Sequence, residues 1–137
     1  MKLDEILKVA KKPKLKEFDC FTKLGPFSLN GYVVIPDDFP LDYYDEFYRS
    51  IDDEPIGGMT FGGYFTLING NLEIVYRGVH LGTTEENEKN AEKIKDLCVR
   101  CIGFDDSHAW PIDLTGTDGA KYLANELKKL AGKSNEA

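Results

Sequence analysis

The stretch from Met59 to Arg77, MTFGGYFTLINGNLEIVYR, decides the fold class of this chain. At its centre is the pair Asn69-Gly70, whose residues both tolerate the positive φ angles of a tight two-residue turn. A glycine-interrupted strand-like run over 59–68 precedes the pair, and a second run over 72–77 follows it. The sequence therefore predicts an antiparallel β-hairpin, and with it a sheet that contains antiparallel strands.

Three other segments have the composition of β-strands. Residues 30–36 hold Tyr, Val, Val and Ile in a row and end at a proline, which cannot donate to a strand ladder. Residues 97–104 form a second apolar run, and the weaker strand-like segment 17–23 precedes the turn pair Gly25-Pro26. Together with the hairpin, these segments predict a sheet of four to five strands.

Three further segments show the patterns of helices. Apolar residues recur every three or four positions over 2–11 and again over about 118–131. Thr83 and Glu86 have the spacing of a capping box at the start of a polar helix near 84–95.

The order of these elements predicts one α+β domain over residues 1–132. A mainly antiparallel sheet is packed by the N-terminal helix, by the helix near 84–95 and by the C-terminal helix. We expect the last helix to close near Gly132 and residues 133–137 to form a loose tail. Residues 41–50 fit either a short helix or an irregular loop.

Composition and charge narrow the kinds of partner. The 137 residues carry a formal net charge of −7, which argues against non-specific binding to nucleic acid or to an anionic membrane. We expect no signal peptide, because residues 1–16 are lysine-rich and amphipathic, and no apolar run reaches the roughly 18 residues of a membrane span. Three cysteines without secretory features favour reduced thiols and a cytoplasmic location.

One short run concentrates the residues that could carry chemistry. Gly103 to Trp110, GFDDSHAW, contains one of the two histidines and the single tryptophan, directly after a strand-like segment. The carboxylate of Asp105 could orient the imidazole of His108 and fix its tautomer, which leaves the second ring nitrogen to act as a base, an acid or a metal ligand. The alternative is structural: Asp105 caps a turn, and His108 donates to a backbone carbonyl that holds the loop shut.

The run Ile56 to Phe61, IGGMTF, is the second candidate element. Gly57 and Gly58 allow backbone conformations closed to other residues and let a ligand approach the chain. Thr60 would then present a hydroxyl beside the same site. The alternative is a bulge or a tight approach to the strand, which the following pair Gly62-Gly63 favours.

The spacing of Cys98 and Cys101 allows three interpretations: zinc ligands, a redox pair or two buried thiols. On a strand the two side chains point to opposite faces, and a zinc site would need further ligands from Cys20 and the histidines. We therefore expect buried thiols, with no metal and no cofactor. His80 fits a structural role in a loop, with a place in the site as the alternative.

An acidic segment, residues 37–54, carries eight carboxylates against one base, Arg49, and is interleaved with aromatic residues such as Tyr43 and Tyr44. Aromatic side chains anchor protein interfaces, and acids steer basic partners toward them. The segment could equally mimic a phosphate backbone. The structural alternative is a solvated loop whose aromatic residues pack inward.

Four blocks occur together along the chain. They are Asn30-Gly31-Tyr32-Val33 with Pro36 and Pro40, Gly57-Gly58-Met59-Thr60-Phe61, Gly103-Phe104-Asp105 with His108-Ala109-Trp110, and Tyr122 with Glu126 and Leu130. In their order and spacing, from about residue 29 to 131, they resemble a family of small uncharacterised proteins of tailed phages and prophages.

This chain departs from the family pattern at two positions. Ile56 stands where the family usually has a histidine before the double glycine, and Pro111 stands where it usually has an acid. The resemblance implies a phage or prophage origin. The departures favour a structural or ligand-binding role over catalysis or metal binding.

These patterns lead to one main hypothesis and two alternatives. We expect a small acidic accessory protein that binds a host macromolecule or a small ligand in the bacterial cytoplasm, for instance to counter a host defence. The first alternative is a small hydrolase or transferase that uses Asp105 and His108, with or without a metal. The second is a polar core that ties the last helix to the sheet. The residues expected to contribute to binding are Gly57, Gly58, Thr60, Asp105, His108, Trp110, Tyr43 and Tyr44. The sequence leaves the partner's identity and the oligomeric state open.

Overall fold

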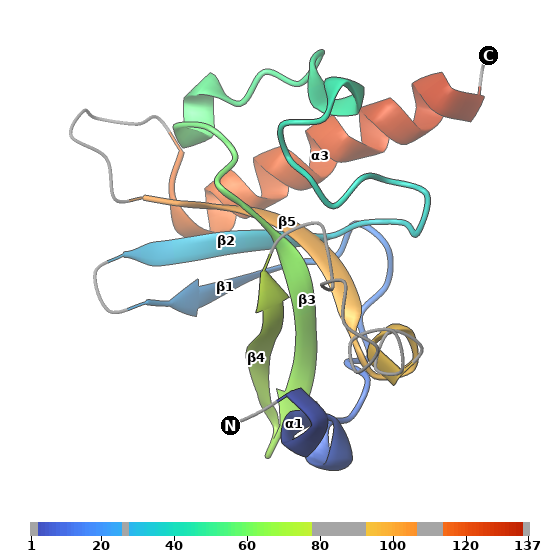
Figure 1. The fold of residues 1–137 in the computed structure, drawn as a ribbon. Coiled ribbons are helices and arrows are strands. Elements are labelled where there is room, and N and C mark those ends of the chain that lie inside the picture. The colour runs from blue at the N-terminus through green and yellow to red at the C-terminus, as the bar shows by residue number, and fades with distance from the viewer. Residues whose placement is uncertain (1–2, 26–27, 78–92, 107–113, 136–137) are drawn as a thin grey trace.

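The computed structural model describes residues 3–25, 28–77, 93–106 and 114–135. They form an α+β fold in which five antiparallel strands make one curled sheet, in the order β1-β2-β5-β3-β4, with a long helix across one face (Figure 1). The fold class predicted from the sequence is confirmed. The elements are α1 (Leu3–Val9), β1 (Cys20–Leu24), β2 (Leu29–Val34), β3 (Phe61–Ile68), β4 (Asn71–Arg77), β5 (Val99–Asp105) and α3 (Gly116–Asn135).

The β3–β4 hairpin turns at the two residues that predict it. Asn69 has a φ of 52° and Gly70 a φ of 80°, as a tight two-residue turn requires, and Ile68 pairs with Asn71 across it. A register shift between Tyr64 and Phe65 marks a bulge in this pair. A bulge bends its strand and increases the local twist, so it contributes to the curl of the sheet.

Strand β5 lies at the centre of the sheet, hydrogen-bonded to β2 on one side and to β3 on the other. Because side chains alternate along a strand, Ile102 and Phe104 join the core under α3, whereas Val99 and Cys101 join a second core inside the curl. Both faces of β5 are therefore buried, which explains why its sequence is a nearly continuous apolar run.

The core inside the curl is largely aromatic. Ring centroids of Tyr32 and Phe65 lie 4.7 Å apart, and those of Tyr32 and Phe61 5.2 Å apart, both edge to face. From the edge strand β1, Phe21 reaches Phe65 at 5.1 Å. Contacts of this geometry contribute beyond simple burial, and here they hold β1 against the sheet.

The two edge strands approach each other across the open side of the curl. Lys23 of β1 donates from Nζ to the carbonyl oxygen of Leu72 on β4 at 2.8 Å. Its ammonium also lies 3.8 Å from the carboxylate of Glu73. Farther along the sheet, Lys11 and Leu67 form an isolated antiparallel bridge. These contacts occupy strand edges that would otherwise offer unpaired backbone groups.

Helix α3 packs on the sheet through the apolar stripe that its sequence predicts. Ala120, Leu123, Leu127 and Leu130 are all buried. The predicted end near Gly132 is wrong, because the helix continues to Asn135 and so includes residues 133–135 of the predicted tail. A glycine ends a helix when it takes a left-handed conformation, and the left-handed glycines of the described chain are Gly57, Gly58, Gly70 and Gly116.

Two other segments can be compared with their predictions. A helix is predicted near 84–95, and the structure describes this region from residue 93, where residues 93–97 are helical. Because the helix includes residue 97, the following strand begins at Val99 rather than at 97. Residues 41–50 form turns and one short 3-10 helix, Glu46–Tyr48, in place of a regular helix. Among the helices in the described ranges, none combines the length and apolar character needed to cross a membrane.

A pair of glycine substitutions tests how closely the acidic segment packs on β3. A Cβ atom at Gly62 would overlap the backbone carbonyl of Leu41, and a carbonyl cannot rotate away as a side chain can. We predict that Gly62→Ala lowers the free energy of unfolding by about 3 kcal/mol, at the upper end of overpacking effects. The measurement is a denaturant titration followed by circular dichroism.

Gly132→Ala is the matched control. A Cβ atom there meets nothing within 4 Å, and alanine is favoured over glycine in a helix by about 1 kcal/mol. We expect this variant to be as stable as the wild type or slightly more so. Equal stability of the Gly62→Ala variant and the wild type would contradict the close packing.

Candidate functional site

The residues after the double glycine lie beside the end of strand β5. Thr60 donates from Oγ1 to Oδ2 of Asp105 at 3.2 Å, and its backbone N–H donates to the carbonyl of Gly103 at 2.9 Å. Two segments that are 45 positions apart in sequence therefore meet, as the sequence hypothesis requires. The backbone contact extends the β3–β5 ladder by one residue, so strand pairing positions the Thr60 hydroxyl.

A hollow of about 130 Å³ opens at this contact. Ser28, Asn30, Thr60 and Asp105 give it polar walls, and Tyr32, Phe61 and Phe104 complete the lining. Ser28 donates from Oγ to Oδ1 of Asn30 at 2.8 Å. The volume is well below the roughly 300–1,000 Å³ of typical small-molecule pockets, so the hollow suits an ion, water or a single functional group.

The double glycine has a clear structural role. Gly57 and Gly58 have φ angles of 78° and 99°, and their N–H groups donate to the carbonyls of Glu54 and Asp53, both at 2.9 Å. The Asp53 carboxylate accepts from the N–H of Met59 at 3.0 Å. This arrangement ends the 3-10 helix Glu54–Ile56 and turns the chain toward β3. It matches the structural alternative, a tight approach to the strand. A binding role for the two glycines stays a prediction.

Two predicted site residues, His108 and Trp110, lie outside the described residues, and so does His80, for which a place in the site is the alternative to a structural role. The proposed orientation of an imidazole by Asp105 is therefore not tested, and the hydrolase or transferase alternative that depends on it stays a prediction. Among the residues that the structure does describe, no group of three or more His, Cys, Asp or Glu side chains could hold a metal ion.

The aromatic residues of the acidic segment divide between the core and the surface. Phe39 and Tyr48 are buried in the core under α3, and Tyr48 donates to the carbonyl of Pro40. Tyr43 is half-buried against the same core, whereas Tyr44 is 82% exposed. Their ring centroids lie 4.5 Å apart. The alternative interpretation of this segment is a solvated loop whose aromatic residues pack inward. Most of its aromatic residues do pack inward, but Tyr44 does not.

Half of the carboxylates in this segment shape its turns. Asp42, Asp45 and Asp52 each accept a hydrogen bond from the backbone N–H two residues ahead, as aspartates in turns commonly do, and Asp53 accepts the one from Met59. Six of the eight carboxylates in the segment belong to exposed residues: Asp37, Asp38, Asp45, Glu46, Asp52 and Glu54. The segment is thus both tightly turned and negative on its outside.

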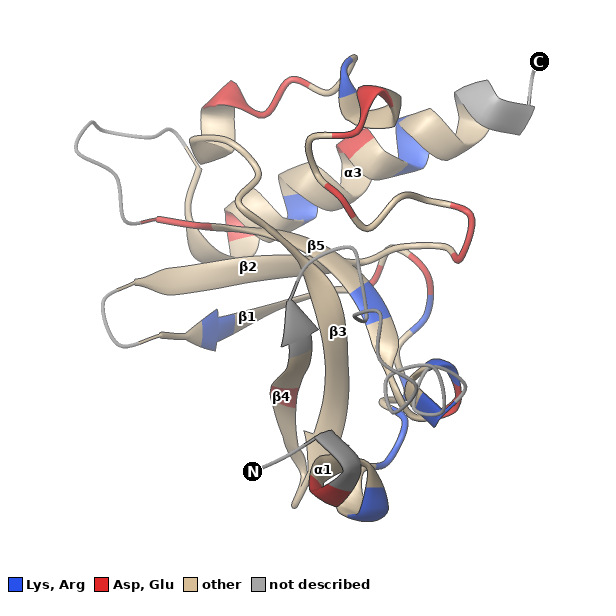
Figure 2. Cartoon of the chain, in the orientation of Figure 1, with Lys and Arg blue, Asp and Glu red and all other residues tan. Residues whose placement is uncertain are grey.

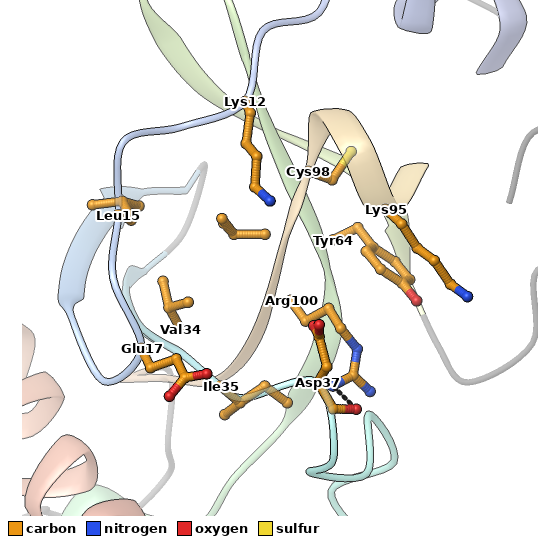
Figure 3. A pocket seen from close by; sticks show the side chains of 11 residues that line it. Lys12, Leu15, Glu17, Val34, Ile35, Asp37, Tyr64, Lys95, Cys98 and Arg100 are labelled. Atoms are coloured by element: carbon orange, nitrogen blue, oxygen red, sulfur yellow. Dashed lines mark hydrogen bonds between the residues drawn. The ribbon is translucent and has the colours of Figure 1, made fainter. Parts of the chain in front are cut away.

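A larger cavity, which the sequence did not predict, lies on another part of the molecule. It has a volume of about 510 Å³ and opens between the chain after α1, the end of β2 and the start of β5 (Figure 3). Its walls combine apolar side chains with charged ones. The basic residues are Lys12, Lys95 and Arg100, the acidic ones Glu17 and Asp37, and the others Leu15, Val34, Ile35, Tyr64, Cys98 and Val99.

Arg100 is held in this cavity by two hydrogen bonds to the backbone. Its Nη1 donates to the carbonyl oxygens of Pro36 at 2.8 Å and Asp37 at 3.2 Å. Neutral backbone groups thereby orient the guanidinium, and among the described residues no carboxylate forms an ion pair with it. The sequence carried no signal for this cavity, because its residues come from four separate segments and follow no common spacing.

Cys98, which lines the cavity, and Cys101 are both buried, as the sequence analysis expects. Cys98 packs with Leu7 and Ile94, whereas Cys101 packs inside the curl, so the two face different cores. Burial raises the pKa of the Cys98 thiol to about 11, although the hydroxyl of Thr66 and the ammonium of Lys12 oppose that rise. Burial also raises the pKa of Cys101.

No family model, curated protein or solved structure matches this chain.

Thiol reactivity tests the environment of the cysteines. The thiolate is the reactive form, and a pKa of about 11 leaves only a small thiolate fraction at pH 8. We predict that an aromatic disulfide reagent leaves Cys98 and Cys101 unmodified in native protein at pH 8, and that both react in denaturant. Peptide mass spectrometry identifies the modified residue. Because ionisation grows toward the raised pKa, labelling of Cys98 should accelerate as the pH rises from 8 to 10; rapid labelling at pH 8 would contradict the burial.

Proposed function

We propose that this chain is an accessory protein of phage or prophage origin that binds a basic surface of a host protein in the bacterial cytoplasm. Countering a host defence is the role that such binding would serve. The observation that carries the proposal is the exposed ring of Tyr44, 82% accessible, on a negatively charged and well-anchored segment. Exposed tyrosines surrounded by polar groups are frequent anchors of protein interfaces.

Anchoring of the acidic segment supports a binding role. Phe39, Leu41 and Tyr48 hold it in the core, and Tyr122 of α3 donates to the carbonyl of Asp52 at 2.8 Å. A surface already held in one conformation loses little entropy when a partner binds. The burial of these side chains therefore favours recognition as well as stability.

Charge distribution supports a basic partner. In Figure 2 the acids of residues 37–54 lie along the loops that cross over α3, whereas lysines gather on the chain after α1 and on residues 93–97. The exposed acids of the segment have one basic neighbour within it, Arg49, which pairs with Glu46 at 2.9 Å. A local negative potential speeds association with a basic partner and disfavours acidic ones.

The test is affinity capture from a bacterial lysate, followed by binding measurements on the recovered protein. We expect a stoichiometric partner whose affinity falls at least about tenfold with Tyr44→Ser or Asp38→Lys, since hot-spot aromatics contribute about 2 kcal/mol or more. The association rate should also fall as salt rises from about 50 to 300 mM, because screening shortens the range of the acidic field.

Two matched variants control for surface chemistry and net charge. Leu24→Ser removes another highly exposed apolar side chain, 79% accessible, from strand β1. Asp96→Lys makes the same charge change at an exposed residue outside the acidic segment. Both should bind like the wild type. Equal losses for the test and control variants, or no specific partner, would overturn the proposal.

A further inference from the structure

We infer that the cavity lined by Lys12 and Arg100 is a binding site for a small organic anion, a carboxylate or a phosphate monoester with an apolar body. This inference goes beyond the proposed function. The cavity meets the acidic segment only at Asp37, so variants at Lys12 or Arg100 test it separately from variants at Tyr44 or Asp38.

The size and walls of the cavity fit a small molecule. Its volume of about 510 Å³ is within the usual range for ligand pockets, roughly 300–1,000 Å³. Val34 and Val99, from the neighbouring strands β2 and β5, and Ile35 supply apolar wall. Burial of the ligand's apolar body against these side chains would contribute binding free energy. The charged groups around them would then determine which polar group the ligand can carry.

Two of the cations that line the cavity could each bind the anionic end. In Figure 3 the side chain of Lys12 runs from the N-terminal chain into the cavity, and Arg100 reaches its lower end from β5. Because two carbonyls already hold the guanidinium of Arg100, it would lose little freedom on binding. Its remaining N–H groups match the paired oxygens of a carboxylate or phosphate.

Neither cation is neutralised by a carboxylate in the part of the chain that is described. The ion pairs found there within 4.0 Å are Lys23–Glu73, Arg49–Glu46 and Lys129–Glu126. The ammonium of Lys12 acts instead on the Cys98 thiol, whose pKa it tends to lower. The described lining of the cavity carries three cations against two carboxylates. In a chain with net charge −7, this positive excess favours anions, which clefts lined mainly by cations concentrate.

Glu17 and Asp37 limit which anions fit. Both line the same cavity, and in Figure 3 the carboxylate of Glu17 lies beside Ile35, away from Lys12. A second negative group on the ligand would be repelled there, whereas a hydroxyl or amine could donate to these carboxylates. The inferred ligand therefore has one anionic group, and polyanions are disfavoured.

The experiment is a titration of ¹⁵N-labelled protein with three probes of similar size: benzoate, phenyl phosphate and the neutral benzamide. Fragment-sized ligands reach millimolar affinity, so titration to about 10 mM is sufficient. We expect one or both anions to shift the amide signals of residues 12, 34–35 and 98–100, and benzamide to leave them unchanged. Comparison of the two anions distinguishes carboxylate from phosphate ligands.

Matched lysine variants separate a site from general charge attraction. Lys12→Met should weaken anion binding about tenfold, whereas Lys14→Met, an exposed lysine of the same segment that does not line the cavity, should leave it unchanged. Arg100→Lys keeps the charge but loses the fork, and should weaken binding while the fold is retained.

Several results would overturn the inference. They are equal shifts with benzamide, equal losses for Lys12→Met and Lys14→Met, or no shift with either anion. None of them bears on whether a host protein binds the acidic segment, so the two proposals can fail independently.

Discussion

The rest of the structure depends on the burial of strand β5 on both of its faces. Its pairing with β2 and β3 makes it the centre of the sheet. Ile102 and Phe104 place it under helix α3, and Val99 and Cys101 place it in the aromatic core of the curl. A strand buried on both faces has little freedom to slip in register, because a shift of one residue would exchange the two sets of side chains.

The two ends of this strand position the two hollows of the molecule. At its start, Arg100 reaches the carbonyls that follow β2 and forms one wall of the larger cavity. At its end, Asp105 meets Thr60 across the β3–β5 pair. The register that buries the core therefore also sets which polar groups meet at each end of the sheet.

The surface has regions of opposite charge that the net charge does not reveal. An overall charge of −7 describes the acidic segment well, where aspartates both shape the turns and face the solvent. The same net charge says nothing of the cavity at the start of β5, whose lining includes Lys12, Lys95 and Arg100. A small acidic protein can therefore present surfaces suited to partners of opposite charge.

The sequence by itself determined the elements that depend on local chemistry. Asn69-Gly70 specified the hairpin, because its φ preferences act within two residues, and the apolar spacing of α3 specified the buried face of that helix. It also predicted that the segments of Thr60 and Asp105 lie side by side, as their hydrogen bond shows, and for the double glycine it left a tight strand entry and a binding role open. Only the tertiary structure decided where α3 ends, which aromatic residues face solvent and that Lys12, Tyr64 and Arg100 line one cavity. These outcomes depend on packing between distant segments, and no periodicity or spacing within the chain encodes such contacts.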